Sequence, residues 1–365
     1  MPETGKAAVL YEAKKPLVVE EIEIEEPRQH EVLVKVAAAG VCHSDLHFIE
    51  GLWPFPLPAV MGHEGAGVVE RVGEGVTSVK PGDHVILSWV PSCGICRECV
   101  TGKPYLCSGG FPPHAMKDGT SRLKKGDRQL FHFTAVSSFA QYLVTHEAAM
   151  VKIRDDAPLD KVALIGCGVM TGVGAVINTA KVEVGSSVAV FGCGGVGLNV
   201  VQGADLAAAT TIIAVDTLDN KLDMAKQFGA THLVNGSKED PVAKIQEISG
   251  GGVDYAFEVI GNPDVITQAF ESVRAGGVAV VVGMPPVGSQ VTLSAARIFL
   301  SAKTLKGCNY GSTRFRVDMP MLVDLYIAGK LKLDELITRT YPLEGINDAF
   351  EAMKKGEVAR SIIKF

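Results

Sequence analysis

Hydrophobic and polar positions follow two different patterns along the chain, and the change comes at about residue 170. Before that point, apolar and polar residues alternate in short runs separated by turns, as is typical of β-strands. The runs that predict strands are 6–10, 17–24, 31–38, the valine-containing stretch 62–82, and 85–90. Residues 109–131 are polar and rich in Gly and Lys without a clear period, so we expect a long surface loop there.

After residue 170, strand-like runs alternate with helical ones. Strands are expected at 187–191, 211–215, 232–234, 253–260 and 277–282. Helices are expected in an Ala-rich run ending at 209 and at 220–228, 241–248 and 264–273. This alternation predicts an α/β fold with a doubly wound parallel sheet. Beyond residue 310, the pattern predicts helices at 319–328 and 346–355 and a closing strand at 361–365.

Composition and charge exclude several classes of protein. The 365 residues suffice for two domains of ordinary size, and 47% are hydrophobic against 21% charged, which indicates a packed globule and not a disordered chain. The formal net charge of −6 gives no basic excess for binding nucleic acid or acidic lipid. We therefore expect a small-molecule substrate and no nucleic-acid partner.

Neither a membrane span nor a secretion signal is expected. Three stretches bounded by charged residues, 161–181, 183–205 and 274–297, approach the length of a span. Glycines interrupt each of them, which favours buried α/β core over a membrane helix. The N-terminal region is acidic and lacks a basic-then-apolar leader, so a cytoplasmic location is expected.

A glycine-rich motif lies between an expected strand and an expected helix. Gly192, Gly194 and Gly197 have the G-x-G-x-x-G spacing, and Asp216 ends the next strand. In this context the glycines allow a tight turn and close approach to a pyrophosphate at a helix N-terminus. Asp216 would bind the adenosine ribose and repel a 2′-phosphate, which favours NAD over NADP. The alternatives are a plain βα corner and an Asp216 that only caps or faces solvent.

Four of the eight cysteines fall close together, in the pattern Cys93-x2-Cys96-x2-Cys99-x7-Cys107. Because no secretory leader is expected, metal ligation is favoured over disulfides. Four thiolates in one loop are typical of a closed structural zinc site. An iron–sulfur cluster is the rival interpretation, but the ferredoxin pattern has three residues before its last cysteine and a proline after it, whereas here Ser108 follows.

A second candidate metal site is dispersed over Cys42, His63 and Cys167. A single buried Cys is usually a small hydrophobic residue, and a single His is usually structural. Together, however, two thiolates and one imidazole leave a fourth position of a zinc ion open for water or substrate.

The chain resembles the zinc-dependent alcohol dehydrogenases of the medium-chain dehydrogenase/reductase family, of the long type with two zinc sites, over almost its whole length. The resemblance rests on Gly-His-Glu-Gly-Ala-Gly-Val-Val at 62–69, on the spacing of the four-cysteine loop and on 192–197. Cys167 favours this branch over the polyol dehydrogenases, which tend to have a carboxylate there. The resemblance implies a GroES-like catalytic domain over 1–168 with a structural zinc loop at 93–107, an NAD-binding Rossmann domain over 169–309, and a return segment 310–365 that completes the catalytic domain.

The resemblance also implies a proton path and a cofactor site. The alkoxide proton would pass to Ser44, then through the nicotinamide ribose, to His47. Asp45 would hold the ring of His63, and Glu64 would pair with Arg360 behind the zinc. The residues implied in NAD binding are His43, Thr171, Gly192, Gly194, Gly195, Val196, Gly197, Asp216, Lys221 and Arg360. Helix capping, solvation and ordinary packing remain alternatives for the individual side chains, and Cys193 and Cys308 are expected to be core thiols.

The expected substrate pocket is apolar and aromatic with one amide, and its residues are Trp53, Trp89, Phe133, Met284 and Asn309. Residues 108–117 contain no arginine and 52–56 no acidic residue, unlike the glutathione-dependent formaldehyde dehydrogenases. We therefore expect oxidation of a primary alcohol carrying an aromatic, allylic or medium-length apolar group. An S-hydroxymethyl-thiol (formaldehyde) dehydrogenase and a nicotinoprotein that retains NAD are alternatives. A homodimer is expected, with a tetramer as the alternative.

Overall fold

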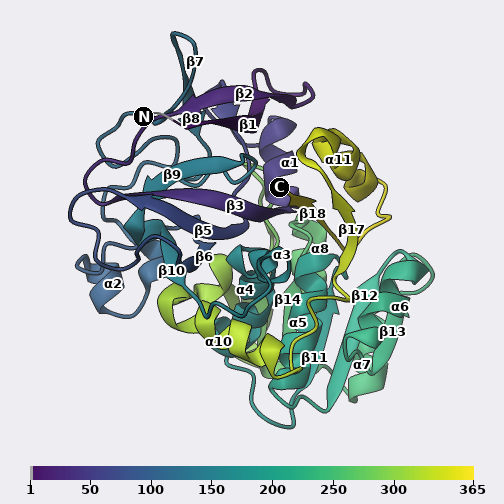
Figure 1. Cartoon of the computed structure of the whole chain (residues 1–365). Helices are drawn as coiled ribbons and strands as arrows, with labels where there is room; N and C mark the ends of the chain where they lie inside the picture. Colours follow the sequence, from purple (N-terminus) through teal and green to yellow (C-terminus); the bar gives the residue numbers. More distant parts are fainter. Residues whose placement is uncertain (1–2) are drawn as a thin grey trace. The chain divides into compact units, whose positions relative to one another are not determined.

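The computed structural model describes residues 3–365, which divide into two units (Figure 1). The first unit contains the described residues up to Cys167 together with Arg314–Phe365, and the second unit is Gly168–Thr313. The second unit therefore begins one residue before the expected boundary and ends four residues after it. The C-terminal segment is part of the first unit because its last strand is built into that unit's sheet.

A small closed barrel forms one part of the first unit. Its strands, in order around the barrel, are β1 (Glu3–Leu10), β2 (Val18–Ile24), β7 (Leu123–Lys125), β8 (Arg128–His132) and β4 (Ala59–Val60). The expectation of a loop throughout 109–131 is wrong in its second half. Leu123 and Leu130 face each other across β7 and β8 and are almost fully buried. Burial in the barrel interior thus determines these two strands, which are too short to show an alternation of apolar and polar residues.

A larger sheet carries most of the residues that concern function. Its order is β10 (Met150–Lys152), β6 (His84–Leu87), β5 (Gly65–Val72), β3 (Glu31–Val41), β18 (Arg360–Lys364) and β17 (Ile337–Tyr341), with β9 (Tyr142–His146) also paired to β3. Ser361 on β18 pairs with Val41 on β3 in an antiparallel ladder. This register brings Arg360 close to the residue that follows β3, which is Cys42.

The second unit is a six-stranded parallel sheet, which confirms the doubly wound α/β expectation. Its order is β13 (His232–Asn235), β12 (Thr211–Asp216), β11 (Ser187–Phe191), β14 (Val253–Glu258), β15 (Val273–Val281) and β16 (Thr304–Gly307). Its helices are α4 (Gly168–Gly174), α5 (Gly195–Leu206), α6 (Asp219–Gln227), α7 (Pro241–Ser249), α8 (Pro263–Ser272) and α9 (Ala295–Ser301), and a π-helix, Ala175–Ala180, continues α4. α4 packs against α5 and α7 against α8, so the helices form separate layers on the sheet (Figure 1).

The first unit has few helices, and one of them is central to the candidate site. They are α1 (His43–Ile49), α2 (Arg97–Val100), α3 (Leu159–Val162), α10 (Phe315–Ile327) and α11 (Ile346–Lys354). Helix α10 begins four residues before the expected 319 and contains Pro320. Within residues 3–365, no single helix is long and apolar enough to cross a membrane, although the bent pair Leu159–Gly166 and Gly168–Ala180 reaches that length and composition together.

Candidate active site and metal centres

Three potential metal ligands converge in the first unit from distant parts of the chain. Cys42 lies between β3 and α1, His63 lies between β4 and β5, and Cys167 follows a 3₁₀ turn at Ala163–Gly166. All three side chains are buried, with exposures of 5%, 3% and 6%. Their ligand atoms lie within 4.8 Å of one another, so the structure brings together the dispersed set that the sequence predicts.

The chemistry of these three residues fits a zinc ion with one open position. The Nε2 atom of His63 lies 3.2 Å from the Sγ atom of Cys167. Hydrogen bonding to Cys167 lowers the pKa of Cys42, and the positive charges of His63 and Arg360 lower it further. The same contact and burial raise the pKa of Cys167. Two sulfurs and one imidazole within reach of one ion form the Cys2His set known from alcohol dehydrogenase.

Two buried carboxylates surround this set. An Asp45 carboxylate oxygen lies 3.1 Å from Nδ1 of His63 and accepts a 3.2 Å hydrogen bond from the backbone N–H of Gly62. Glu64 forms a buried ion pair with Arg360. Burial raises the pKa of Glu64 to about 7, although the charge of Arg360 opposes this rise. Asp45 therefore lies where it can orient the ring of His63, and Glu64 holds Arg360, whose positive charge acts on Cys42.

Helix α1 also carries the residues of the expected proton path. Ser44 and His47 are both half-buried, and they share one face of the helix because they are three residues apart. Burial lowers the pKa of His47. His43, the first residue of the helix, is exposed. These positions put a hydroxyl beside Cys42 and an ionisable ring farther along the same helix.

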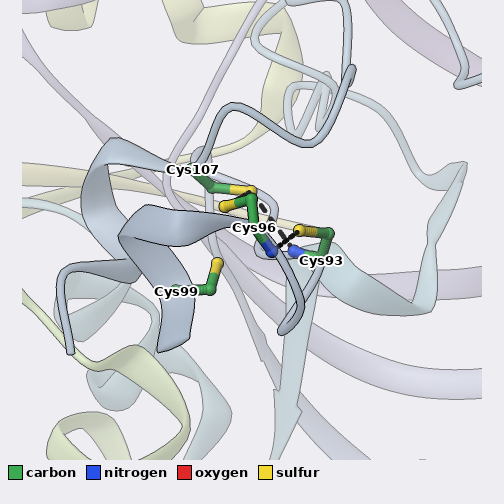
Figure 2. Close-up of side chains that lie close together, drawn as sticks. All are labelled: Cys93, Cys96, Cys99 and Cys107. Atoms are coloured by element: carbon green, nitrogen blue, oxygen red, sulfur yellow. Dashed lines mark hydrogen bonds between the residues drawn. The ribbon is translucent and has the colours of Figure 1, made fainter. Parts of the chain in front are cut away.

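The four-cysteine loop folds around a common centre (Figure 2). Its ligand sulfurs also lie within 4.8 Å of one another, and the Sγ atoms of Cys96 and Cys107 are 3.9 Å apart. The backbone N–H of Cys93 donates to Sγ of Cys107, and that of Cys96 donates to Sγ of Cys93, both at 3.3 Å. The N–H of Cys99 is the main cause that lowers the pKa of Cys96 to about 6. Such N–H···S contacts stabilise thiolates, as a closed tetrahedral zinc site requires.

The glycine-rich motif joins β11 to α5 in the second unit. A Cβ on Gly197 would lie 1.8 Å from the carbonyl oxygen of Gly192, so only glycine permits this close packing. Gly194 is the N-cap of α5, and a Cβ there would meet open space. Gly195 and Val196 form the partly exposed first turn of the helix. The N–H groups of this turn are thus accessible to an anion.

Asp216 ends β12 beside the glycine-rich loop. One of its carboxylate oxygens accepts a 2.8 Å hydrogen bond from the N–H of Cys193, and the other accepts from the N–H groups of Thr217 and Leu218. Lys221 on α6 is half-buried, and its charge acts on the Cys193 thiol, whose pKa is raised mainly by burial. Cys193 is buried as expected, whereas Cys308 is half-buried and accepts a hydrogen bond from Thr179.

The five expected pocket residues have different environments. In the first unit, Trp53 and Trp89 are half-buried and Phe133 is fully buried, with its ring centroid 6.0 Å from that of His63. In the second unit, Met284 is half-buried after β15 and Asn309 is exposed, while Thr171 lies half-buried on α4.

Sequence reasoning missed Phe48 and Phe55, whose rings contact Phe133 edge-on at centroid distances of 4.9 and 5.1 Å. Phe48 follows His47 directly on α1, which is the signal that could have identified it.

Two family models match the chain. Residues 28–155 match the family described as Alcohol dehydrogenase GroES-like domain, and residues 195–326 match the one described as Zinc-binding dehydrogenase. The first match contains Cys42, His63 and the four-cysteine loop, whereas Cys167 lies between the two matches.

Similar proteins cover nearly the full chain. Alcohol dehydrogenase class-3 of Dictyostelium discoideum is 45% identical over 99% of this chain and 97% of its own length. S-(hydroxymethyl)glutathione dehydrogenase of Paracoccus denitrificans is 44% identical over 99% of both chains. Among solved structures, benzyl alcohol dehydrogenase of Acinetobacter calcoaceticus is 39% identical over 100% of this chain and 99% of its own, with a TM-score of 0.95.

The full-length identity and the two sets of ligands lead to the same conclusion. The chain belongs to the zinc-dependent alcohol dehydrogenases of the medium-chain dehydrogenase/reductase family, with a catalytic zinc site, a structural zinc site and NAD as its coenzyme.

Proposed function

We propose that the protein oxidises the –CH2OH group of a small substrate to a carbonyl group and transfers the hydride to NAD. The observation that carries this proposal is the convergence of Cys42, His63 and Cys167, with their ligand atoms within 4.8 Å. A zinc ion held by these residues would supply the Lewis acidity that lowers the pKa of the substrate hydroxyl. The two electrons leave the carbon with one hydrogen as hydride, and the hydroxyl hydrogen leaves as a proton.

The residues of α1 would remove that proton. The Ser44 hydroxyl can accept a proton from the substrate while it donates its own, and His47 on the same helical face can release a proton to solvent. Asp45 would keep the ring of His63 in the orientation that directs Nε2 toward the metal.

The names of the relatives support an S-hydroxymethyl-thiol substrate better than the free aromatic alcohol that the sequence analysis favoured. Two curated relatives at about the same identity are a class-3 alcohol dehydrogenase and an S-(hydroxymethyl)glutathione dehydrogenase. The thiol adduct of formaldehyde is therefore the first candidate substrate, and the expectation of an aromatic or medium-length alcohol becomes the second.

A specific observation keeps the aromatic alcohol as the second candidate. Phe48, Phe55 and Phe133 form an edge-to-face cluster that reaches the ring of His63. Such a cluster favours an apolar or aromatic neighbour for the reacting carbon. The benzyl alcohol dehydrogenase structure, at 39% identity, agrees with this alternative.

Steady-state kinetics with added NAD distinguish the candidates. The kcat/KM for S-hydroxymethylglutathione should exceed that for benzyl alcohol, and the reverse ranking would transfer the assignment to the second candidate. Cys42→Ala should abolish turnover of both substrates and leave NAD binding intact. Persistent activity in this variant would contradict the zinc mechanism itself. NAD that stays bound at one per chain after desalting would instead support the nicotinoprotein alternative.

We also propose that two copies associate through the exposed edge of the parallel sheet. β16 is the last strand of that sheet, and α9 precedes it. Phe299 and Leu300 on α9 are 83% and 80% exposed, and Leu305 on β16 is 39% exposed. Apolar side chains beside a sheet edge are typical of an association surface. Light scattering should give a dimer and Leu300→Asp should weaken it; a monomeric wild-type protein would contradict the proposal.

A further inference from the structure

Two cysteines of the four-cysteine loop, Cys96 and Cys107, lie side by side with their Sγ atoms 3.9 Å apart (Figure 2). In a disulfide the two sulfurs are about 2.05 Å apart, so these atoms would need to approach by about 1.9 Å. Cys96 directly precedes α2, and Cys107 directly follows the 3₁₀ turn Pro104–Leu106. Because neither element contains a buried residue, no core packing opposes a small movement that would bring the sulfurs together.

Cys96 lies on the more open side of this loop. All four cysteines are half-buried, but the two neighbours of Cys96 in the chain are exposed, and one of them, Ile95, is 86% exposed. Cys93 is instead covered by the backbone of Gly109, where a Cβ would lie 2.7 Å from the Cys93 Sγ atom. A small polar oxidant such as hydrogen peroxide therefore has its best access at Cys96.

The two sets of ligands differ in their exposure to such an oxidant. Both sets bind a metal as thiolates, which is the form of cysteine that reacts with peroxide. Cys42 and Cys167 are buried, whereas the four cysteines of the loop are half-buried. Because oxidation of a thiolate depends on its exposure, the loop should react before the catalytic ligands do.

We propose that Cys96 and Cys107 are a peroxide-sensitive pair, whose oxidation to a disulfide releases the structural zinc ion and leaves Cys42 and Cys167 reduced. The proposal does not depend on the substrate, since the pair lies outside the catalytic ligand set. A disulfide would leave only Cys93 and Cys99 as thiolates, which is too few for a closed four-coordinate site.

The oxidation proceeds in two steps. The Cys96 thiolate attacks hydrogen peroxide, so that an S–O bond forms, the O–O bond breaks and hydroxide leaves. The Cys107 thiolate then attacks the sulfur of this sulfenic acid, so that the S–S bond forms, the S–O bond breaks and a second hydroxide leaves. The two thiolates thus lose two electrons. The peroxide takes these electrons and two protons from solvent, and two water molecules result.

The test exposes the zinc-loaded full chain to hydrogen peroxide and follows the released zinc with a chromogenic chelator, against a sample without peroxide. One zinc ion per chain should be released, and peptide mapping without reductant should find a disulfide between Cys96 and Cys107. Dimedone, which traps sulfenic acids, should label Cys96 when it is added together with the peroxide. In a sample without dimedone, dithiothreitol and added zinc should restore the original zinc content.

Cys308→Ala is the matched control, because it removes a half-buried thiol that belongs to neither ligand set. Its zinc should be released at the wild-type rate. Cys96→Asp keeps an oxygen ligand for zinc but has no thiol, and it should release zinc about ten-fold more slowly than wild type. If this variant does not take up zinc, the dimedone label and the disulfide map of the wild-type protein decide the question.

Retention of both zinc ions at peroxide concentrations that oxidise Cys308 would overturn the proposal. A disulfide between Cys42 and Cys167 that forms as fast as the loop disulfide would also overturn it, because the difference in exposure would then have no effect. Zinc release from Cys96→Asp at the wild-type rate, or a dimedone label on another cysteine of the loop, would show that Cys96 is not the residue attacked.

Discussion

The Nδ1 atom of His63 lies 3.1 Å from a carboxylate oxygen of Asp45, and both side chains are buried beside Cys42. Asp45 sits on the first turn of α1, three residues after Cys42, so the helix that carries this carboxylate begins at a metal ligand. The same oxygen accepts a hydrogen bond from Gly62, the residue before His63. The carboxylate therefore fixes both the backbone and the ring of this residue, and Nε2 is left directed toward Sγ of Cys167, where it could bind a zinc ion.

Asp45→Asn should weaken zinc binding at the catalytic site by about 10–100-fold, because a neutral amide polarises the His63 ring less than a carboxylate does. Competition with a chelator, followed by metal analysis, measures this change. Asp83→Asn is a suitable control, because Asp83 is a buried carboxylate of the same unit that pairs with Lys152 at 2.7 Å. Equal zinc affinity in Asp45→Asn and wild type would show that Asp45 does not orient the ligand.

Ser44→Ala should lower kcat by about 10²–10⁴-fold, because a methyl group cannot accept the substrate proton. Zinc content and the Kd for NAD should remain those of the wild-type protein. His47→Gln should have a smaller effect, which added imidazole buffer should partly reverse. A Ser44→Ala enzyme with wild-type kcat would exclude the hydroxyl from the proton path, whatever its effect on KM.

Local patterns in the sequence predicted the second unit well, because each of its first five strands has its own apolar run bounded by turns. They failed at β16, whose Thr-Leu-Lys-Gly sequence is largely exposed and shows no alternation. They also failed at β7 and β8, where burial of Leu123 and Leu130 depends on barrel partners distant in sequence. Such strands are determined by tertiary pairing and not by local propensity.

The candidate site likewise contains residues that local sequence patterns predicted and residues that they did not. The four cysteines of the loop lie within fifteen residues, so spacing alone indicated their convergence. Cys42, His63 and Cys167 were predicted from their ligand types taken together and not from spacing, since no local rule joins residues 125 positions apart. The buried carboxylate of Glu258 was not predicted, because its hydrogen bonds come from the N–H groups of a turn whose shape the sequence does not reveal.

Cys99→Ala should remove one zinc ion per chain and lower the thermal stability of the first unit. Neither α2 nor Pro104–Leu106 contains a buried residue, so we expect the metal to hold this loop in place of a hydrophobic core. Metal analysis and thermal unfolding measure the two effects. Cys308→Ala changes a thiol outside both ligand sets and should keep both zinc ions. Two zinc ions in Cys99→Ala, or iron in the wild-type protein, would contradict a structural zinc site.

The first unit should lose stability as the pH falls below about 6.5, and His132 should account for part of this loss. His132 is fully buried on β8, where its Nε2 accepts a 3.1 Å hydrogen bond from the N–H of Arg122. Burial, together with the charge of Arg122, lowers the pKa of His132 to about 3. Because the folded pKa is below the unfolded one, the unfolded chain binds the proton more readily between these values. The stability contribution is thus fully present above the unfolded pKa and decreases as the pH falls toward 3.

His132→Gln removes the titrating ring but places an amide oxygen near the position of Nε2. Between pH 6.5 and 4.5, the free energy of unfolding of the wild-type unit should therefore fall more steeply than that of the variant, by up to about 1.4 kcal/mol per pH unit. Urea unfolding followed by tryptophan fluorescence reports on this unit alone, because the two tryptophans of the chain, Trp53 and Trp89, both lie in it. Carboxylates also titrate in this pH range, but they do so equally in both proteins. Glu147 is an example: burial raises its pKa, but hydrogen bonds with Ser78 and His30 outweigh burial and lower the pKa to about 2. If the free energy of unfolding changed with pH at the same rate in the two proteins, His132 would be protonated as readily in the folded chain as in the unfolded one.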